Sequence, residues 1–275
     1  MRALPATVLA LLGLATAACG GVANGVSNSD AAGGQSLDVQ AQPQQPAPAA
    51  TAKAAKPLDG KVVVIDPGHN GGNFRDPKAV NRKVNVLTKW KACDTTGTET
   101  ADRYTEAAFT WDVSNRLVKI LKQRGASVKL TRADNTSVGP CITERAAIGN
   151  KAKADAALSV HADGSAPGNH GFHVIMPEKI GGPVDPVVGD SKKLGLAVRQ
   201  AFKKGTGLRY STYIGKDALD FRNDLGGLNL STVPKIFVEC GNMKNAGEAA
   251  KFRDPEFRQR IALALANGLQ QYLKA

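Results

Sequence analysis

Short apolar runs rich in β-branched residues alternate along this chain with longer segments whose apolar residues recur at helical spacing. The first run, Lys61–Asp66 (KVVVID), ends at a Pro-Gly pair and has the length of a buried strand. The first long segment, Glu106–Arg124, places Phe109, Val113 and Leu117 on one face of a helix. Strands that alternate with helices predict an α/β fold with a twisted, mostly parallel central sheet that is flanked by helices.

The same alternation continues to the end of the chain, without an internal repeat. We expect further strands at Ser127–Thr131, Ala156–Val160, Phe172–Met176 and Lys235–Glu239, and further helices at Thr143–Lys153, Asp190–Lys204 and Pro255–Leu273. Of the 275 residues, 42% are hydrophobic, which is enough for one substantial core. We therefore expect a single folded domain that spans residues 59–275.

The first 19 residues have the features of an export signal peptide. Arg2 gives a positive start, and Leu4–Ala18 is an apolar stretch shorter than the roughly 20 residues of a membrane span. The stretch ends in small residues before Cys19, and Ala-Ala-Cys resembles a bacterial lipobox, in which the cysteine is acylated. Thr16 stands where lipoboxes usually have leucine, so lipidation of Cys19 and simple cleavage nearby both stay open. We expect an exported protein of the periplasm or cell envelope, which Cys19 anchors to the membrane if it is acylated.

Residues 20–58 consist mainly of Gly, Ala, Asn, Ser, Gln and Pro, with almost no large apolar side chains. Such a segment cannot bury enough apolar surface to offset its loss of conformational entropy. We therefore predict a disordered linker between the export signal and the folded domain.

The chain is basic, with a formal net charge of +12, and nearly all of this excess falls within residues 59–275. A basic domain attracts acidic partners such as nucleic acid, anionic lipid or an anionic wall polymer. The basic residues are scattered, however, and scattered charge can also serve solubility alone.

Side chains that can bind a metal fall at the expected carboxyl ends of three strands, where open parallel sheets carry their sites. His69 lies in the Gly-rich turn after the first strand, His161 directly follows another strand, and Glu239 ends a third. Glu106 opens the first long helix, at the end that faces the same rim. Two imidazoles, one carboxylate and an open position match a catalytic zinc site, and a second carboxylate can serve as its base.

The spacing of these residues is a weak signal, because it matches no compact metal motif. A single histidine is more often a hydrogen-bonded structural residue than a ligand. His170 and His173 are alternative ligands, the first in a loop and the second inside a strand-like run.

Four segments carry a resemblance to a known family. They are Val62–Gly72 (VVVIDPGHNGG), Glu106 before the long helix and the string Val128–Arg132 (VKLTR), Arg145–Asp163 (RAAIGNKAKADAALSVHAD) and Val238–Asn245 (VECGNMKN), in that order. Residues 61–275 resemble the zinc-dependent N-acetylmuramoyl-L-alanine amidases, which cut stem peptides from the glycan strands of peptidoglycan. The family fold is a twisted, mostly parallel sheet flanked by helices.

The resemblance implies one Zn²⁺ per chain, with ligands at His69, Glu106 and His161 and a catalytic carboxylate at Glu239. It implies peptidoglycan or muramyl-peptide fragments as substrate, a role in cell-wall remodelling and no nucleic acid partner, and we expect a monomer. Zinc would activate the water and polarise the lactyl amide carbonyl, while Glu239 would move the water's proton to the leaving amine.

The chain departs from the family pattern at two positions. Asp163 stands where members often have asparagine, and Asn229 stands near where they often have arginine. No substrate role is therefore assigned to either residue. Arg132 and Arg145 are interpreted as scaffold residues that pair with acids.

Cys93 and Cys141 lie in loops of an exported domain, which predicts a disulfide between them. Cys240 follows Glu239 in a strand and should point to the opposite face, as a buried thiol.

Two other functions stay open. One is another zinc peptidase of wall peptides, such as a carboxypeptidase, and the other is a non-catalytic, tethered wall-binding lipoprotein. Nucleotide binding by the Gly-rich turn is disfavoured, because residues 66–72 contain neither the GxGxxG nor the GK[ST] pattern.

Overall fold

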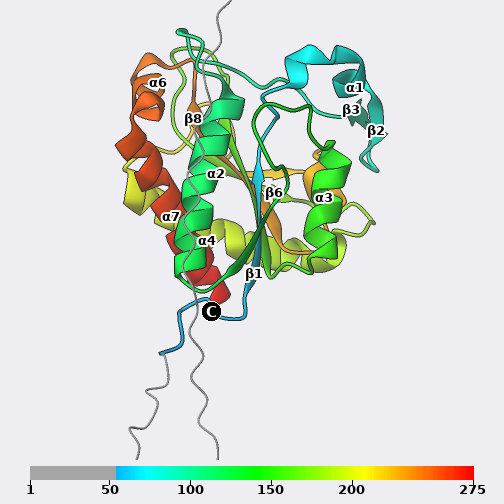
Figure 1. Cartoon of the computed structure of the whole chain (residues 1–275), viewed down its shortest axis with the longest axis vertical. Helices are drawn as coiled ribbons and strands as arrows, with labels where there is room; N and C mark the ends of the chain where they lie inside the picture. The colour runs from blue at the N-terminus through cyan, green and yellow to red at the C-terminus, as the bar shows by residue number, and fades with distance from the viewer. Residues whose placement is uncertain (1–53) are drawn as a thin grey trace, which may run out of the picture. The chain divides into compact units, whose positions relative to one another are not determined.

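A six-stranded sheet with the order β4-β1-β5-β8-β6-β7 runs through the middle of the domain (Figure 1). The structure, a computed structural model, describes residues 54–275; the predicted signal peptide, Cys19 and the predicted linker up to residue 53 lie outside them. The strands are β1 (Val62–Pro67), β4 (Ser127–Leu130), β5 (Ala156–Asp163), β6 (His173–Pro177), β7 (Leu219–Arg222) and β8 (Lys235–Asn242). All neighbouring strands are parallel except β6 and β8, which confirms the predicted mostly parallel sheet.

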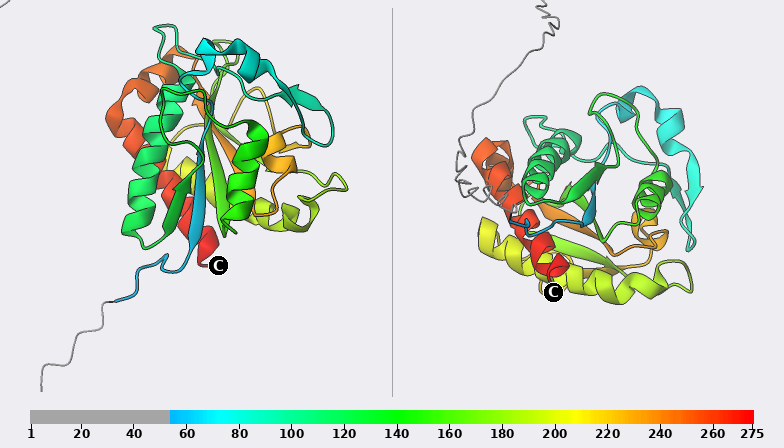
Figure 2. Two further views of the ribbon diagram at one scale, coloured as in Figure 1. Left: turned by 45° about the vertical axis from the view of Figure 1, so that its right-hand side comes forward. Right: turned by 60° about the horizontal axis from the view of Figure 1, so that its bottom comes forward.

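Helices cover both faces of this sheet (Figure 2). One face is covered by α2 (Glu106–Gln123), α4 (Val188–Thr206) and α7 (Pro255–Leu273), with α6 (Ala246–Arg253) beside α7, and the other face by α3 (Ile142–Lys151) and α5 (Gly226–Asn229). The main core lies under α2, α4 and α7. The predicted α/β fold is confirmed. No helix in the described part of the chain has the length and apolarity needed to cross a membrane.

The long helices begin at residues that cap their free N–H groups. The hydroxyl of Thr105 accepts a hydrogen bond from the backbone N–H of Ala108, and Glu106 follows as the first residue of α2. The carboxylate of Asp254 accepts from the N–H of Glu256, and Pro255 occupies the first position of α7. Capping thus sets where Glu106 enters the fold, at the carboxyl edge of the sheet.

A small arm between β1 and α2 was not predicted. It contains the helix α1 (Pro77–Asn81) and a two-stranded antiparallel sheet of β2 (Lys83–Asn85) and β3 (Trp90–Ala92). Its strands have three residues each, so the buried Val84, between exposed Lys83 and Asn85, is too short a pattern to identify a strand; Trp90 on β3 is 65% exposed. The predicted disulfide is present here, because the Cys93 and Cys141 sulfur atoms lie 1.94 Å apart and join the arm to α3. Cys240 is a free, buried cysteine, as expected.

The folded part begins slightly earlier than the sequence indicates. Leu58, which we assigned to the linker, is completely buried in the main core. Its backbone N–H donates to the carbonyl of Arg124, at the end of α2. The boundary was missed because one leucine in a polar stretch gives no periodic signal.

A buried ionic cluster joins β1, β5 and β8 to α3. The Asp66 carboxylate on β1 lies 2.7 Å from Arg145 Nη1 and 3.1 Å from Lys235 Nζ. It also accepts hydrogen bonds from the hydroxyls of Thr131 at 2.6 Å and Ser159 at 2.9 Å. Burial alone would raise the pKa of Asp66, but Lys235 and Arg145 hold that pKa well below its usual value. Four segments distant in sequence thus converge on one carboxylate.

Replacement of Asp66 by asparagine should destabilise the domain by about 3–5 kcal/mol, because two buried cations lose their counter-charge. The matched control is Asp190→Asn, since Asp190 forms an exposed pair with Lys193 and should cost about 0–1 kcal/mol. Urea unfolding at pH 7 gives both free energies. Equal effects of the two substitutions would contradict this role for Asp66.

The cost of Asp66→Asn should also depend on pH. The folded-state pKa of Asp66 is depressed, so its stabilisation is fully present above the unfolded pKa of about 3.9 and is lost as pH falls below it. The difference in unfolding free energy between wild type and Asp66→Asn should be constant from about pH 5 to 7. It should shrink below about pH 4, and a difference that stays constant there would refute the depressed pKa.

Candidate metal centre

His69 lies in the turn after β1, with a strained backbone. Its φ of 58° is in the left-handed region, which non-glycine residues seldom adopt. Its Nδ1 lies 3.1 Å from the carbonyl oxygen of Thr95, and its own carbonyl accepts a hydrogen bond from Arg145 at 2.9 Å. A ring held through Nδ1 leaves Nε2 to face the centre of the site.

Glu106, the first residue of α2, is buried between two histidines. Its Oε2 lies 3.0 Å from His69 Nε2, and its Oε1 lies 2.9 Å from His161 Nδ1. The backbone N–H groups of Thr98 and Ala162 also donate to the carboxylate. Burial opposes ionisation, but His69 and His161 lower the pKa of Glu106 overall, so the carboxylate is charged.

His161 lies on β5, immediately before an irregularity in its pairing with β8. Its ring stacks on Phe237 of β8, with the ring centroids 5.3 Å apart. On another side the ring contacts Gly68 so closely that a Cβ there would overlap with it. The ring is therefore fixed by a neighbouring strand and by a glycine of the turn that carries His69.

These three residues form the one group of metal-binding type found among residues 54–275. One ligand atom each from His69, Glu106 and His161 lies within 4.8 Å of the others. Two imidazoles and a carboxylate, with space on the open side, are the donor set of a catalytic zinc site. The site residues that the sequence indicates are thus brought together, and the donor set fits a zinc ion.

Glu239 lies beside this group on β8, directly opposite His161 in the register of β5 and β8. Residues paired in this way point to the same face of a sheet. Its Oε2 is buried without a hydrogen-bond partner. Burial, and then repulsion from Glu106 and Asp163, raise the pKa of Glu239 well above its usual value.

The alternative ligands are not part of the group. His170 lies in the loop before β6, and His173 is buried on β6, away from the three ligand atoms. Arg145 is buried and pairs with Asp66 and Asp94, which confirms its predicted scaffold role. Arg132 is also buried and donates to the carbonyl of Pro67, but among the described residues it forms no ion pair with an acid, so that part of the prediction is wrong. Asn229 is also structural, since its Nδ2 donates to carbonyls of the arm and of a neighbouring loop.

Sequence reasoning missed the loop that closes over the ligands. Gly97 has a φ of 74°, and a Cβ there would lie 2.7 Å from Glu106 Oε2 and 2.8 Å from a ring carbon of His69. Asp94 accepts hydrogen bonds from Asn70 and Arg145 beneath the same turn. The one sequence signal for this loop is that Asp94 directly follows Cys93, a residue predicted to form a disulfide.

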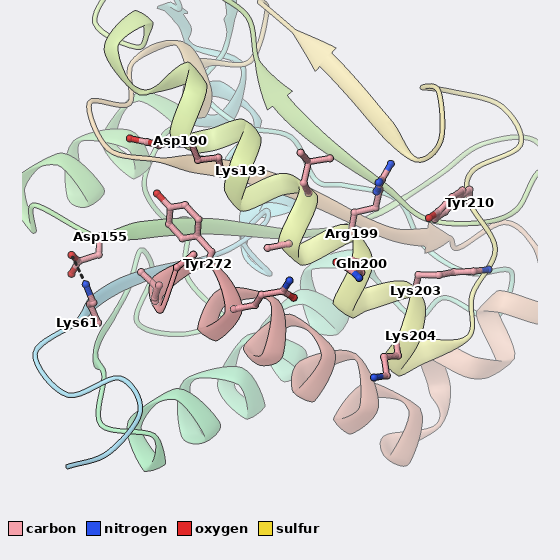
Figure 3. Close-up of a pocket in the computed structure, with 15 residues that line it drawn as sticks. Lys61, Asp155, Asp190, Lys193, Arg199, Gln200, Lys203, Lys204, Tyr210 and Tyr272 are labelled. Carbon is pink, nitrogen blue, oxygen red and sulfur yellow. Dashed lines mark hydrogen bonds and ion pairs between the residues drawn. The ribbon is translucent and has the colours of Figure 1, made fainter.

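The domain has a small cavity at the metal-binding side chains and a larger groove away from them. A cavity of about 220 Å³ is lined by His69, His161 and Phe237, and extends under the arm. A larger groove, of about 1160 Å³, lies between α4 and the C-terminal end of α7 (Figure 3). The Lys61–Asp155 ion pair at its rim marks the edge where β1 and β5 begin, so this groove is remote from the ligands.

The fold thus brings together three side chains that could hold a metal ion, and the comparisons with known proteins identify the class of enzyme. Residues 63–271 match the family model described as N-acetylmuramoyl-L-alanine amidase. The chain is 37% identical over 218 residues to N-acetylmuramoyl-L-alanine amidase Rv3717 of Mycobacterium tuberculosis. The alignment covers 78% of this chain and 88% of the relative. It is 27% identical to the probable cell wall amidase LytH of Staphylococcus aureus, over 81% of this chain and 62% of the relative.

Solved structures agree with these matches. The N-acetylmuramyl-L-alanine amidase Ami1 of Mycobacterium abscessus has 40% sequence identity and a TM-score of 0.74, and the match covers 78% of this chain and 100% of that one. Ami1 of Mycobacterium smegmatis has 36% identity and the same TM-score of 0.74, with 78% and 98% coverage. The chain belongs to the N-acetylmuramoyl-L-alanine amidase family.

Replacement of Gly68 by alanine should weaken metal binding, because the new methyl group would displace the ring of His161. We expect zinc affinity to fall by about 10–100-fold, as for disruption of groups that orient ligands. The control is Gly189→Ala in α4, where an added Cβ meets nothing within 4 Å. Competition with a zinc chelator gives both affinities, and a Gly68→Ala protein that binds zinc like wild type would contradict the packing argument.

Proposed function

We propose that this protein is a zinc-dependent hydrolase that cleaves the amide bond between N-acetylmuramic acid and L-alanine in peptidoglycan. The observation that carries the proposal is the convergence of His69, Glu106 and His161 next to Glu239 at one edge of the sheet. Membership of the amidase family, shown over residues 63–271, supplies the substrate and the bond.

His69, Glu106 and His161 would hold the zinc ion. When bound, zinc supplies Lewis-acid polarisation of the scissile carbonyl and a lower pKa of water at neutral pH. The turn and the helix start keep these side chains in place before substrate arrives, because His69 and Glu106 are fixed by backbone groups. Preorganisation of this kind lowers the cost of reaching the transition state.

Glu239 would act as the general base and then as the general acid. It would take a proton from the attacking water and donate it to the nitrogen of the leaving L-alanine amine. Burial and the carboxylates nearby raise the pKa of Glu239, which favours its retention of that proton until the amine leaves. The residue thus moves a proton without acting as a ligand.

The wider setting also belongs to the proposal. We infer export to the periplasm or cell envelope, with Cys19 as a membrane anchor where it is acylated, and action by a monomer on peptidoglycan or its muramyl-peptide fragments. Relatives that are named cell wall amidases support an envelope location. Product analysis separates the proposal from its alternatives, because an amidase frees the amine of L-alanine, a carboxypeptidase releases a C-terminal amino acid, and a wall-binding protein releases neither.

Purified protein should contain one zinc ion per chain, and alanine substitution of His69, Glu106 or His161 should remove most of it. Each substitution deletes one of three protein ligands, and the remaining two bind zinc far more weakly. Elemental analysis after dialysis against a weak chelator measures the stoichiometry, with His170→Ala as the matched control. Near-full zinc in the His161→Ala protein would refute the ligand assignment.

Glu239→Gln should retain zinc and the fold but lose about 10²–10⁴-fold of the hydrolysis rate, because the amide cannot accept the proton. Glu178→Gln, at an exposed position after β6, should keep the wild-type rate. Cleavage of a muramyl peptide, zinc content and melting temperature are measured on the same samples. Loss of zinc together with rate would make Glu239 a ligand instead, and wild-type turnover would remove its catalytic role.

A further inference from the structure

Three titratable side chains form a row across neighbouring strands at the metal centre. His161 on β5 pairs in register with Glu239 on β8, and Glu239 pairs in turn with His173 on β6. Paired residues share a face, and in antiparallel strands their Cβ atoms lie about 4.5–5.5 Å apart. Glu239 therefore has a metal-facing histidine on one side and a second histidine, without an assigned role, on the other.

Buried polar atoms without a hydrogen-bond partner gather at this second side. Of eight such side-chain atoms within the described ranges, two are His173 Nδ1 and Glu239 Oε2, and a third, Tyr213 Oη, lies beside the Asp163 carboxylate. The ring of Tyr213 meets the ring of His173 edge to face, with the centroids 6.0 Å apart. An unsatisfied buried polar atom costs about 1–3 kcal/mol, so a cluster of them at a catalytic edge points to function.

His173 is a neutral imidazole at physiological pH. Burial lowers its pKa to about 4, with Arg222 acting in the same direction and Asp163 against it. His173 is only 1% exposed, so its side chain is shielded from solvent water. A neutral imidazole keeps one N–H donor and can pair with a carboxylate without adding charge to the site.

We propose that His173 is a positioning residue for Glu239, and that its Nδ1–H donates a hydrogen bond to Oε2 of Glu239 in the substrate-loaded enzyme. This bond would fix the carboxylate with its other oxygen toward the attacking water. Hydrogen bonds of catalytic groups are often unformed in a free enzyme and tighten when substrate binds. Tyr213 would hold the plane of the His173 ring through the edge-to-face contact.

The proposal rests on the proposed function, because it assigns a partner to the general base of that reaction. A metal-ligand role for His173 does not compete, since the metal-binding group contains only the other three residues. A purely structural role does compete, because a buried histidine on a central strand can simply fill space. The test must therefore distinguish orientation of Glu239 from packing.

The experiment compares three substitutions of His173 in the zinc-loaded full chain. The amide nitrogen of asparagine can take the place of Nδ1, that of glutamine takes the place of Nε2, and leucine offers no donor. We expect His173→Leu to lower kcat by about 10–100-fold with KM within about 2-fold, and His173→Asn to recover most of kcat. The kcat of His173→Gln should be as low as that of His173→Leu. Muramyl-peptide cleavage, zinc content and melting temperature are recorded for each.

A double-mutant cycle provides the second readout. In the Glu239→Gln background, His173→Leu should change the residual rate by less than about 2-fold, because the group that it positions is already gone. His170→Asn, three residues away in the preceding loop, is the control and should keep wild-type kcat. Should His173→Leu fail to fold, the asparagine and glutamine variants still give the comparison.

The possible results separate the two hypotheses. Wild-type kcat in His173→Leu, equal loss in the asparagine and glutamine variants, or additive losses in the cycle would overturn the positioning role. A wild-type protein that binds zinc yet cleaves no muramyl peptide would instead overturn the proposed function. Loss in the leucine and glutamine variants, with recovery by asparagine and no further loss in Glu239→Gln, supports the positioning role.

Discussion

The carboxylate of Asp66 is the interaction on which the active edge of this domain depends. It lies at the end of β1, buried, and binds Arg145 from α3 and Lys235 from β8. Arg145 then continues to the carbonyl oxygens of Pro67 and His69, so the same guanidinium neutralises the cluster and holds the turn that carries a metal-binding histidine. A buried ion pair gains little stability over apolar packing, but it specifies geometry, because its partners tolerate few other arrangements. Here that specificity lies directly beneath the metal-binding side chains.

Close approach of backbone to side chain is the second constraint, and it explains the glycines. Gly68 contacts the ring of His161, and Gly97 crosses over Glu106 and His69, so a methyl group at either position would collide with the site. His69 adopts a left-handed backbone conformation, which costs free energy, and in this conformation its Nε2 lies beside Glu106. Gly68 lies in the turn that the sequence indicated and Gly97 in the loop that it did not, and both positions exclude a side chain for steric reasons.

Much of the fold followed from local patterns, because local physics determines it. The terminal helix Pro255–Leu273 matches its predicted bounds, since a proline at the first position and a regular apolar face both act within a few residues. The antiparallel direction of β6 and the burial of Leu58 depend on contacts between distant segments and leave no periodic trace, while the strands of the small arm are too short to be identified. The metal-binding residues could be selected because strand ends and a family resemblance coincide. The neighbourhood of His173 could not, since its register opposite Glu239 exists only once β6 pairs with β8 in reverse.

The distribution of charge links these constraints to function. The chain carries a formal net charge of +12, yet at one edge Glu106 and Asp163 lie close enough to Glu239 to raise its pKa. Carboxylates gathered in a buried site repel one another, and a bound cation or retained protons must offset that repulsion. The pKa of Glu239 is raised by burial and by the carboxylates of Glu106 and Asp163, whereas the pKa of Glu106 is lowered, against burial, by His69 and His161. Two glutamates thus lie in different surroundings, Glu106 between two imidazoles and Glu239 beside two carboxylates, which fits the ligand role proposed for the first and the proton-transfer role proposed for the second.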